Sequence, residues 1–329
     1  GGNCKRKKAN TEKTEEKAET RYKGITGADS ARVETALGVH WKGDSLFLEL
    51  PIKYLGRQFL VTNKMVQVPR EMNEAGVNKG IVYQEGNIRF EWDKQKARIV
   101  MREQRVTPNV DKDAAIARSV ADNYIDPIVE TMKVEAVSVD STTLLFKAND
   151  LFDGSKTTLN DVFANTNLGT SAKKELSRIV KVTPCEKGLV ALSELSTVVH
   201  EGMQKANITV VVSTALTMLP AEPMARRTED WRVGYFTTPS LQFADEQQAV
   251  KRTNHITRWR LVPSDTAAYL RGELTDPVQP ITFHIDPAVP AQWRPFIKQG
   301  IEDWNKAFEQ AGFSNAIRAL DYTDSIHAE

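Results

Sequence analysis

The sequence predicts a β-rich α+β fold, in which antiparallel sheets and hairpin meanders precede one strand and one long helix. Two observations predict this class. Over most of the chain, short segments that alternate apolar and polar residues are separated by glycine, proline, asparagine and aspartate, as in half-buried strands. The clearest helical periodicity lies in residues 293–311, where apolar side chains recur at spacings of three and four.

Composition narrows the function classes. The chain has 329 residues, 40% of them hydrophobic, which is enough for two or three domains with cores of their own. Its net charge of +1 gives no overall field that would attract nucleic acid or an anionic membrane. No apolar run reaches the about 18 residues of a membrane span, so no transmembrane helix is predicted.

Residues 1–32 are predicted to be a disordered tail or tether. They combine a basic cluster at 5–8 with Lys, Glu, Thr and Ala, and Tyr22 is the only aromatic residue. Such a composition buries too little apolar surface to offset the entropy of ordering. The basic cluster allows binding to an anionic lipid or a partner, but a solvated tether is the simpler interpretation.

The two cysteines do not predict a disulfide, because Cys4 lies in the tail and Cys185 in a turn or at a strand edge. No apolar signal segment precedes Cys4, so we expect any signal peptide to have been removed or to be missing from this sequence. Cys4 is either the lipid-bearing cysteine of an exported lipoprotein or an incidental tail residue. Asn3 favours the second interpretation, because small residues precede a lipidated cysteine.

Residues 33–78 are predicted to form a small N-terminal β module. Gly43 and Asp44 form a turn signal between two strand-like segments, which indicates a hairpin. In order, the expected segments are strands at 38–42 and 45–50, a short helical step at 51–56 and an extended segment at 58–68.

Residues 79–276 are predicted to form a β-rich middle domain. Ile88, Phe90 and Trp92 alternate with charged residues, which predicts a strand with one buried face. Two hairpins are expected, one of 80–84 and 87–92 turning at 85–86 and one of 129–139 and 142–148. Further strands are expected at 97–105, 179–184, 189–192 and 257–262, with a central strand at 208–215. The remaining segments are a helix at 111–122, a helical turn at 157–163, and connections at 219–240 and 247–253.

Residues 277–329 are predicted to be the start of a further domain. Pro280 and Pro287 bound a strand at 281–286, and a helix follows over 293–311. Gly312 is placed at the C′ position of that helix, with Phe313 as the hydrophobic contact after it. The apolar stripe of the helix consists of Trp293, Ile297, Ile301, Trp304, Phe308 and Ala311.

Zinc catalysis needs three protein ligands and an open position for water, and the H-E-x-x-H helix commonly supplies two of the ligands. Only His200-Glu201 begins that motif here. Gln204 occupies the second ligand position, and Gly202 weakens the helix that the motif requires. We therefore interpret His200 and Glu201 as an exposed loop pair.

The other four histidines have no ligand partner at helical spacing. His40 is expected on a sheet face, His255 in a polar connection and His327 at an untethered end. His284 is expected on the strand face that it shares with Thr282, at the surface or a cleft edge. No catalytic, cofactor-binding or metal residue is predicted.

Other catalytic motifs are missing from the sequence, which has no G-x-S-x-G elbow and no glycine-rich phosphate loop. A group of arginines interleaved with aromatic residues allows binding of an anion, a substrate carboxylate or nucleic acid. The balanced charge argues against nucleic acid, and structural pairing with carboxylates is simpler. The group consists of Arg226, Arg227, Arg232, Arg252, Arg258 and Arg260, with Trp231, Tyr235, Phe236 and Trp259.

Several segments together resemble one known family: residues 46–57, 232–238, 254–261, 280–286, 293–295, 300–308 and 311–317. The resemblance spans residues 33–322 and is to a large Bacteroidetes family of exported zinc-dependent metallopeptidase-like proteins. Residues 46–57 are similar to its small N-terminal module. Residues 232–238 and 254–261 are similar to its β-rich middle module of unknown function. The segments from residue 280 onward are similar to the first strand and helix of its metzincin-like catalytic domain.

The resemblance implies hydrolysis of a peptide or protein substrate by zinc-activated water with a glutamate base, in the periplasm, at the outer-membrane surface or outside the cell. The family's H-E-x-x-H helix lies downstream of this first helix, whereas the sequence ends at Glu329. No catalytic or zinc residue is therefore carried over. We expect a non-catalytic N-terminal part that binds no zinc itself and ends in an incomplete zincin-like domain at 277–329. A fragment, a frameshifted product and an engineered truncation all fit this expectation.

Two further function classes stay open. An exported β-rich module could bind a peptide or glycan along a sheet edge or aromatic groove without a metal. An intact enzyme could assemble its site from scattered acidic residues.

For partners, we expect no nucleic acid, a membrane only through a lipid at Cys4, and self-association through 280–329, whose strand would lack its neighbours. We expect this segment to be separable after Asp276 without loss of core stability.

Overall fold

The computed structural model describes residues 21–28, 34–105, 108–242 and 251–322. The chain divides into two compact units between Pro223 and Met224. We call residues up to 223 the barrel unit and the residues from 224 the C-terminal unit. Among the described residues, no helix combines the length and apolarity needed to cross a membrane.

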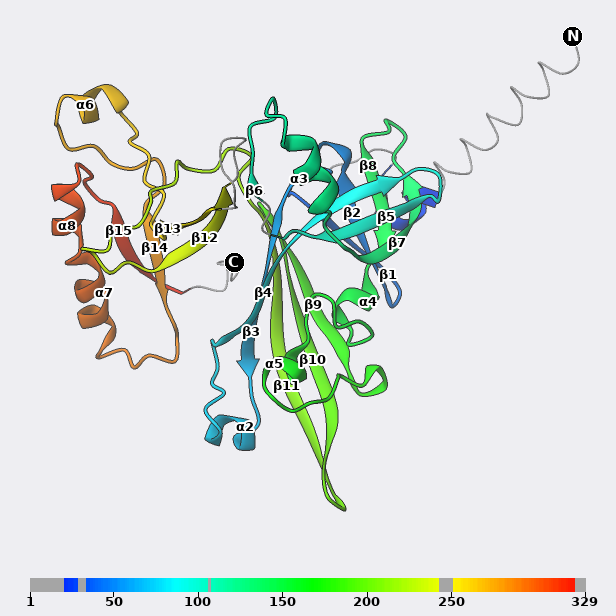
Figure 1. The fold of residues 1–329 in the computed structure, drawn as a ribbon. Coiled ribbons are helices and arrows are strands. Elements are labelled where there is room, and N and C mark those ends of the chain that lie inside the picture. Colours follow the sequence, from blue (N-terminus) through cyan, green and yellow to red (C-terminus); the bar gives the residue numbers. More distant parts are fainter. Residues whose placement is uncertain (1–20, 29–33, 106–107, 243–250, 323–329) are drawn as a thin grey trace, which may run out of the picture. The chain divides into compact units, whose positions relative to one another are not determined.

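The barrel unit is built on one ten-stranded antiparallel sheet that curls into a nearly closed barrel (Figure 1). The order across the sheet is β1-β2-β8-β7-β5-β4-β3-β11-β10-β9. The two outer strands, β1 and β9, approach each other, and the backbone N–H of Ala36 donates to the carbonyl of Glu186 at 2.9 Å. The strands are β1 (Gly38–Lys42), β2 (Ser45–Pro51), β3 (Phe59–Gln67), β4 (Val82–Asp93), β5 (Arg98–Glu103), β7 (Ile128–Val137), β8 (Thr143–Lys147), β9 (Arg178–Cys185), β10 (Gly188–Glu201) and β11 (Gln204–Met218).

The curvature has a local cause. The ladders shift register within β3–β4, between Asn63 and Lys64, and within β5–β7, between Met101 and Arg102. An extra residue in one strand increases twist and bends the sheet, which helps the sheet to close. At the start of β10, a Cβ on Gly188 would lie 1.7 Å from the carbonyl oxygen of Leu216, so only glycine permits this close approach to β11.

The main core fills the barrel. Its buried apolar side chains come from nine of the ten strands, β2 to β5 and β7 to β11, as expected for inward-facing positions of a closed sheet. Phe59, Phe90 and Phe146 are fully buried at its centre, and the ring of Phe90 lies 5.5 Å from Phe59 and 6.2 Å from Phe146. Each fully buried side chain of this kind contributes about 1.5–3 kcal/mol relative to an exposed one.

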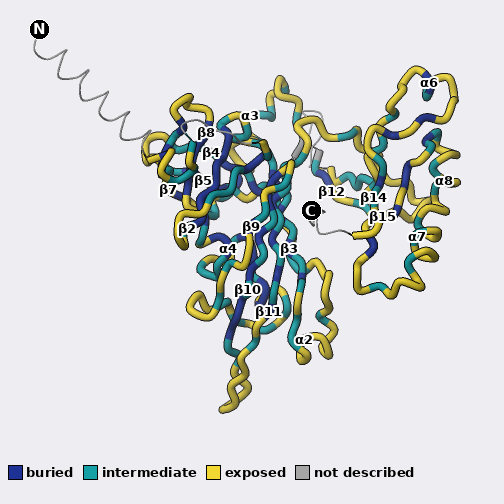
Figure 2. Tube along the Cα trace, turned by 180° about the vertical axis from the view of Figure 1, so that it is seen from behind, coloured by how far each residue is buried: buried dark blue, intermediate teal, exposed yellow. Residues whose placement is uncertain are grey.

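A second core covers the part of β10 and β11 that extends past the barrel. Met72 of α2 (Arg70–Glu74) and Phe163 of α5 (Val162–Asn165) pack with Leu195 and Val212. The tip of the β10–β11 hairpin, residues 200–207, is exposed (Figure 2). The other short elements of the unit are η1 (Ile52–Tyr54), β6 (Pro108–Asn109), α3 (Ala117–Asn123), α4 (Asn149–Phe152) and η2 (Lys174–Leu176).

A third, small core corrects the expected tail. Residues 21–26 are helical, and Tyr22 is fully buried against Phe47, Ala136 and Leu145. Residues 21–28 are therefore part of the barrel unit, and the prediction of a disordered tail up to residue 32 is wrong for them. The segment is anchored by Tyr22 and Ile25, which pack on an apolar site on the outer side of the sheet, and by the ion pair of Arg21 with Glu135. Residues 1–20, with Cys4 and the basic cluster, lie outside the described residues.

The C-terminal unit contains two small sheets. β12 (Thr237–Gln242) and β13 (Lys251–Ile256) pair antiparallel, and β14 (Ile281–Ile285) pairs in parallel with β15 (Ile317–Asp321). The crossover from β14 to β15 contains α7 (Arg294–Glu302) and α8 (Asn305–Gln310), and α6 (Thr266–Leu270) precedes β14. The side chain of Asn305 holds the start of β15 through the N–H and carbonyl of Ile317, at 3.0 and 2.9 Å.

The end of α8 confirms the predicted cap. Gly312 has a φ of +94°. Its N–H donates to the carbonyl of Glu309 at 3.0 Å, and the N–H of Phe313 donates to the carbonyl of Phe308 at 3.0 Å. This pair of bonds is the Schellman motif. Phe313 is buried, with its ring 5.2 Å from that of Tyr269. The predicted single helix over 293–311, by contrast, is interrupted between α7 and α8.

Several predicted elements have different bounds. Residues 85–86 do not turn, because Gly86 continues β4 and pairs with Val61, so the predicted hairpin is one long strand. The helix expected at 111–122 is confined to α3, since Asp111 instead accepts the N–H of Asp113 in a turn. The strand expected at 257–262 is not formed; the strand lies earlier, at β13. The hairpins around Gly43 and around residues 140–141 are confirmed.

The structure also groups the residues differently from the expected domains. The boundary between 78 and 79 falls between β3 and β4, which are neighbours in the same sheet. The boundary after Asp276 falls inside the C-terminal unit, because the N–H of Thr275 bonds to the carbonyl of Gly312 at 3.2 Å and the hydroxyl of Ser314 bonds to the Asp276 carboxylate at 2.5 Å. Residues 264–276 are thus tied to the segment that was expected to be separable.

Candidate functional site

The structure places the start of the zinc motif on a strand. His200 and Glu201 end β10 and pair with Lys205 and Gln204 across the hairpin tip. Successive residues of a strand point to opposite faces, so these two side chains cannot take the positions of a helical ligand and base. Among the described residues, no three His, Cys, Asp or Glu side chains gather in a way that could hold a metal ion.

His40 belongs to a buried polar cluster on β1 and β2. Its Nε2 contacts one carboxylate oxygen of Glu49, which is only 3% exposed, and the Tyr22 hydroxyl donates to the other at 2.7 Å. Burial, and then the hydrogen bond and charge of Glu49, raise the pKa of Tyr22, so the hydroxyl stays protonated as a donor. The cluster attaches residues 21–26 to the sheet, which is a structural role.

His255 lies on β13 rather than in a polar connection. Its Nε2 is 2.7 Å from the hydroxyl of Ser240, and its Nδ1 is buried without a partner among the described side chains. A serine–histidine pair acts as a nucleophile when an acid orients the imidazole and the serine is accessible. Ser240 is only 6% exposed, so this pair does not form an accessible nucleophilic site.

His284 is on β14, where Thr282 and His284 share the exposed face, as predicted. The arginine–aromatic group is spread over the C-terminal unit. Arg232 forms an ion pair with Asp230 at 2.7 Å, which supports structural pairing for this member. Trp231 and Phe236 are 92% and 88% exposed. His327 lies outside the described residues.

Among the described residues, a cavity of about 410 Å³ lies where β5 ends and β7 begins, and we call it the rim cavity. Val61, Ile88 and Leu159 form its apolar floor; they are nearly fully buried and belong to the main core. The other lining residues are mostly polar. On β4, Glu85 and Asn87 alternate with Gly86 and Ile88, so their side chains face the other side of the sheet, whereas Glu103 lies opposite Ile88 on the side of the floor. The complete lining is Val61, Gln84, Glu85, Gly86, Asn87, Ile88, Glu103, Gln104, Val129, Thr158 and Leu159.

A buried hydrogen-bond network fixes one wall of the rim cavity. Asn63 donates to the carbonyl of Leu159 at 2.8 Å and accepts from the hydroxyl of Thr214 at 2.7 Å. Asn160 donates to Thr214 at 3.1 Å and accepts from the Tyr83 hydroxyl at 2.8 Å. Because these groups are satisfied by one another, the loop that carries Thr158 and Leu159 is held in place over the sheet.

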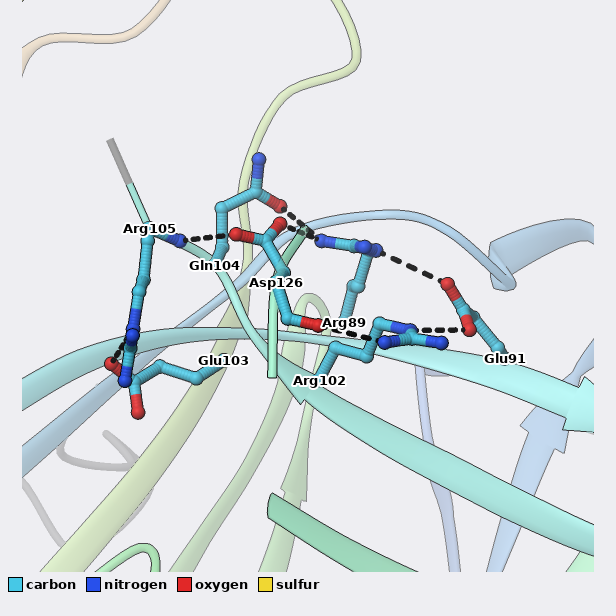
Figure 3. Close-up of polar contacts among 7 residues, drawn as sticks. All are labelled: Arg89, Glu91, Arg102, Glu103, Gln104, Arg105 and Asp126. Carbon is cyan, nitrogen blue, oxygen red and sulfur yellow. Dashed lines mark hydrogen bonds and ion pairs between the residues drawn. The ribbon is translucent and has the colours of Figure 1, made fainter. Parts of the chain in front are cut away.

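A charged network lies next to the cavity, around the end of β5 (Figure 3). Asp126 is 8% exposed; its carboxylate accepts from Arg89 and, at 3.0 Å, from the backbone N–H of Arg105. Arg102 donates to the Asp126 carbonyl at 2.7 Å and to Glu91 at 2.8 Å. Burial raises the pKa of Asp126, but the hydrogen bonds from Arg89 and Arg105 and the charges of Arg89 and Arg102 outweigh it, so the pKa lies below its usual value.

This network holds the segment after β5 against β4 and so positions Gln104 at the cavity. Two cations near the cavity are also occupied: Arg89 by Asp126, and Arg105 by Glu103 at 3.3 Å. Sequence reasoning missed the rim cavity because Gly86 was interpreted as a turn. The available signal was the polar run Gln84, Glu85 and Asn87 around a glycine, directly before a segment in which apolar and charged residues alternate.

The β14–β15 pair has one open face. On one face, Ile281, Ile317 and Ala319 are buried, although Phe283 on that face is 42% exposed. On the other face no residue is buried, and Leu320 is 40% exposed. His284 and Arg318 share the exposed face. Parallel strands in proteins are normally covered on both faces. The exposed face of this pair therefore differs from the usual environment of parallel strands.

The fold defines the chain first as a β-barrel-like domain followed by a smaller α+β unit. Its described residues contain no cluster that could hold a metal ion. Residues 80–264 match a protein family described as a domain of unknown function, DUF5117. This match covers more than half of the chain, which therefore belongs to that family. No curated protein and no solved structure matches it.

Proposed function

We propose that this chain is the non-catalytic N-terminal region of an exported zinc-dependent metallopeptidase of the metzincin-like kind found in Bacteroidetes. The supporting observation is the β14–α7–α8–β15 crossover, whose sheet is covered on one face and open on the other. Two parallel strands joined by a helical crossover usually belong to a larger sheet that is covered on both faces. The open face of this pair is therefore consistent with the beginning of a longer domain.

The chemistry in this proposal belongs to a part of the protein outside this chain. In a zinc peptidase, a metal-bound water attacks the peptide carbonyl and a glutamate acts as the base. The described residues bring no three ligands together, so we derive no step through zinc and assign no catalytic role here. The barrel unit would present or position a peptide substrate, and a lipid at Cys4 would attach the protein to a membrane.

Reading the gene beyond the codon for Glu329 tests the proposal directly. We expect an in-frame H-E-x-x-H helix downstream. The product that includes it should retain about one zinc per chain and cleave peptides, whereas this chain alone should retain none after dialysis. A stop codon before any such motif, or one zinc tightly retained by this chain, would overturn the proposal.

The open face gives a second test. This chain alone should self-associate in a concentration-dependent way, because Leu320 and its neighbours are uncovered. Leu320→Lys should reduce that association in light scattering. The control Leu270→Lys changes an exposed leucine of α6, which lies outside the sheet, and should leave the association unchanged. Equal effects of both variants would contradict an interface on the sheet face.

A second candidate function is a metal-free binding module for a peptide or glycan. Its supporting observation is the exposed aromatic side chains of the C-terminal unit, with Trp231, Tyr235 and Phe236 at 92%, 59% and 88% exposure. Exposed aromatic groups of this size mark interaction surfaces. Tryptophan fluorescence during titration with peptides and oligosaccharides tests it. A saturable change that Trp231→Ala removes would support this candidate, and an unchanged spectrum would count against it.

A further inference from the structure

We propose that the outer face of the barrel carries a peptide-binding site, which residues 21–28 fill in this chain and which the same segment of a second copy can fill in exchange. This inference concerns the barrel unit and depends on neither proposed function. It rests on a row of residues across four strands, on a buried carboxylate and on the way in which the segment is attached.

Strand pairing builds the floor of this site. Glu49 of β2 lies opposite Gly38 of β1 and, on its other side, opposite Leu145 of β8. Leu145 in turn lies opposite Ala136 of β7. Opposite residues project to the same face, and Leu48, the neighbour of Glu49, belongs to the main core, so this row projects to the outer face. A Cβ on Gly38 would lie 2.9 Å from the Cβ of Glu49, so the glycine leaves the space that Glu49 occupies.

The carboxylate of Glu49 gives the site its specificity. It is only 3% exposed, and a buried carboxylate is costly unless other partners replace its lost water. His40 of the sheet contacts one of its oxygens, and the Tyr22 hydroxyl of the segment donates to the other at 2.7 Å. The Tyr22 ring is fully buried against Phe47 and Leu145. The site therefore accepts an aromatic ring that carries a donor, and it favours tyrosine over phenylalanine.

The residues on either side of the tyrosine have contacts of their own. Arg21 forms an ion pair with Glu135 of β7, whose side chain is 16% exposed. Ile25 packs against the same small core as Tyr22. Charge-assisted hydrogen bonds are stronger than neutral ones, and burial of the apolar side chain adds to the affinity. The site thus fits a helical segment with the pattern Arg-Tyr-x-x-Ile, which residues 21–25 supply.

The segment is attached through its side chains, as a docked peptide is. Among the described residues, no hydrogen bond between backbone groups joins residues 21–28 to the sheet. Within the segment, the N–H of Gly27 donates to the carbonyl of Lys23 at 2.8 Å, and the hydroxyl of Thr26 donates to the carbonyl of Tyr22 at 3.1 Å. A segment without a backbone ladder opens locally at a lower free energy than the strands do. Its exchange between two identical copies forms the same contacts again, so this exchange costs little.

Fluorescence anisotropy with the full chain tests the site. The probe is a dye-labelled, amidated peptide with the sequence of residues 21–28. In the wild type, the attached segment competes at an effective concentration in the millimolar range, whereas Tyr22→Ala removes its main anchor. We expect saturable binding of one peptide to Tyr22→Ala, and binding at least about 10-fold weaker to the wild type. The peptide with phenylalanine in place of tyrosine should bind Tyr22→Ala about 10-fold more weakly, because it lacks the donor to Glu49.

The matched control is Tyr124→Ala, which changes an exposed tyrosine at the end of α3 and should bind the peptide as weakly as the wild type does. Unfolding midpoints should show that Tyr22→Ala is folded. If it is not, Tyr22→Phe, which keeps the ring, carries the test and should bind the peptide more tightly than the wild type does. No saturation at millimolar peptide, or equal binding of the tyrosine and phenylalanine peptides, would overturn the proposal.

Exchange between copies is tested by refolding from urea at high protein concentration, with light scattering as the measurement. The starting variant is Leu320→Lys, because it should suppress association through the β14–β15 face. We expect a dimer that the same variant with Tyr22→Ala added does not form, since the second change removes the exchanged anchor. A refolded chain that stays monomeric, or a dimer that persists with Tyr22→Ala, would overturn the exchange.

Discussion

In the barrel unit, the rings of Phe59, Phe90 and Phe146 are fully buried, whereas in the C-terminal unit Trp231 and Trp304 are 92% and 64% exposed. The difference follows from architecture. A sheet that curls into a barrel has an interior that receives every inward-facing side chain. A two-stranded parallel sheet with helices on one face has no such interior. The barrel unit therefore contains its own stabilising core, and the C-terminal unit retains apolar surface that is free to contact something else.

The largest expected difference between the two units is in the stability lost when an aromatic side chain is truncated. Phe90→Ala removes a ring at the centre of the main core, and we expect a loss of about 3–5 kcal/mol in the free energy of unfolding of the barrel unit. Trp304→Ala truncates an exposed ring and should change the stability by no more than about 0.5 kcal/mol. Denaturant unfolding measures both. A comparable loss for Trp304→Ala would show that the C-terminal stripe is covered in solution.

Two aspartates allow a buried ion pair in the barrel unit to be compared with an exposed ion pair in the C-terminal unit. Asp126→Asn removes a buried partner of Arg89 and should cost about 1.5–3 kcal/mol at neutral pH. Asp230→Asn removes the exposed partner of Arg232 and should have almost no effect. Both variants leave the side-chain volume nearly unchanged, so the difference reports burial.

The pH dependence of the same pair follows from linkage. The folded pKa of Asp126 lies below its usual value of 3.8, so its contribution is fully present above the unfolded pKa and is lost as the pH falls through the folded pKa. The stability difference between wild type and Asp126→Asn should therefore shrink below about pH 4. Urea titrations at several pH values measure it, and a constant difference down to pH 2 would contradict the assignment.

A smaller effect should come from the N-terminal helical segment. Tyr22→Phe removes the donor to the buried carboxylate of Glu49, and we expect a loss of about 1–2 kcal/mol in the free energy of unfolding. Tyr235→Phe, at an exposed position of the other unit, is the control and should be neutral. Limited proteolysis should also cut Lys23 faster in Tyr22→Phe. Equal cleavage rates would mean that the segment is held without this bond.

The smallest expected effects concern two glycines and differ in sign. Gly312→Ala places a Cβ 2.7 Å from the Tyr269 ring at a φ of +94°, so α8 should lose about 1 kcal/mol. Gly300→Ala has open space and lies within α7, so the helix should gain about 0.5–1 kcal/mol. Hydrogen exchange of the helix amides measures both. A loss for Gly300→Ala would show that a partner approaches α7 closely.

The sequence by itself determined the local features. Turn residues located the hairpin at Gly43, alternation located the strand around Phe90, and Gly312 with Phe313 marked the end of α8. These signals depend on neighbours within a few residues, whose steric and hydrogen-bonding preferences act in any context. The resemblance to known proteins and the predicted β-rich class also came from such segments.

Only the tertiary structure decided the order of the strands, the burial of Tyr22 and the rim cavity. Leu46 meets Asn149 at 2.7 Å, and Asn63 meets Thr214 at 2.7 Å, contacts that no local pattern encodes. The residues around Gly86 are compatible with a turn and with a long strand. The strand is formed because Gly86 pairs with Val61 of β3. The rim cavity exists because β7, β5, β4 and β3 lie next to one another beside the loop that carries Thr158 and Leu159, and that order depends on the pairing of the whole sheet.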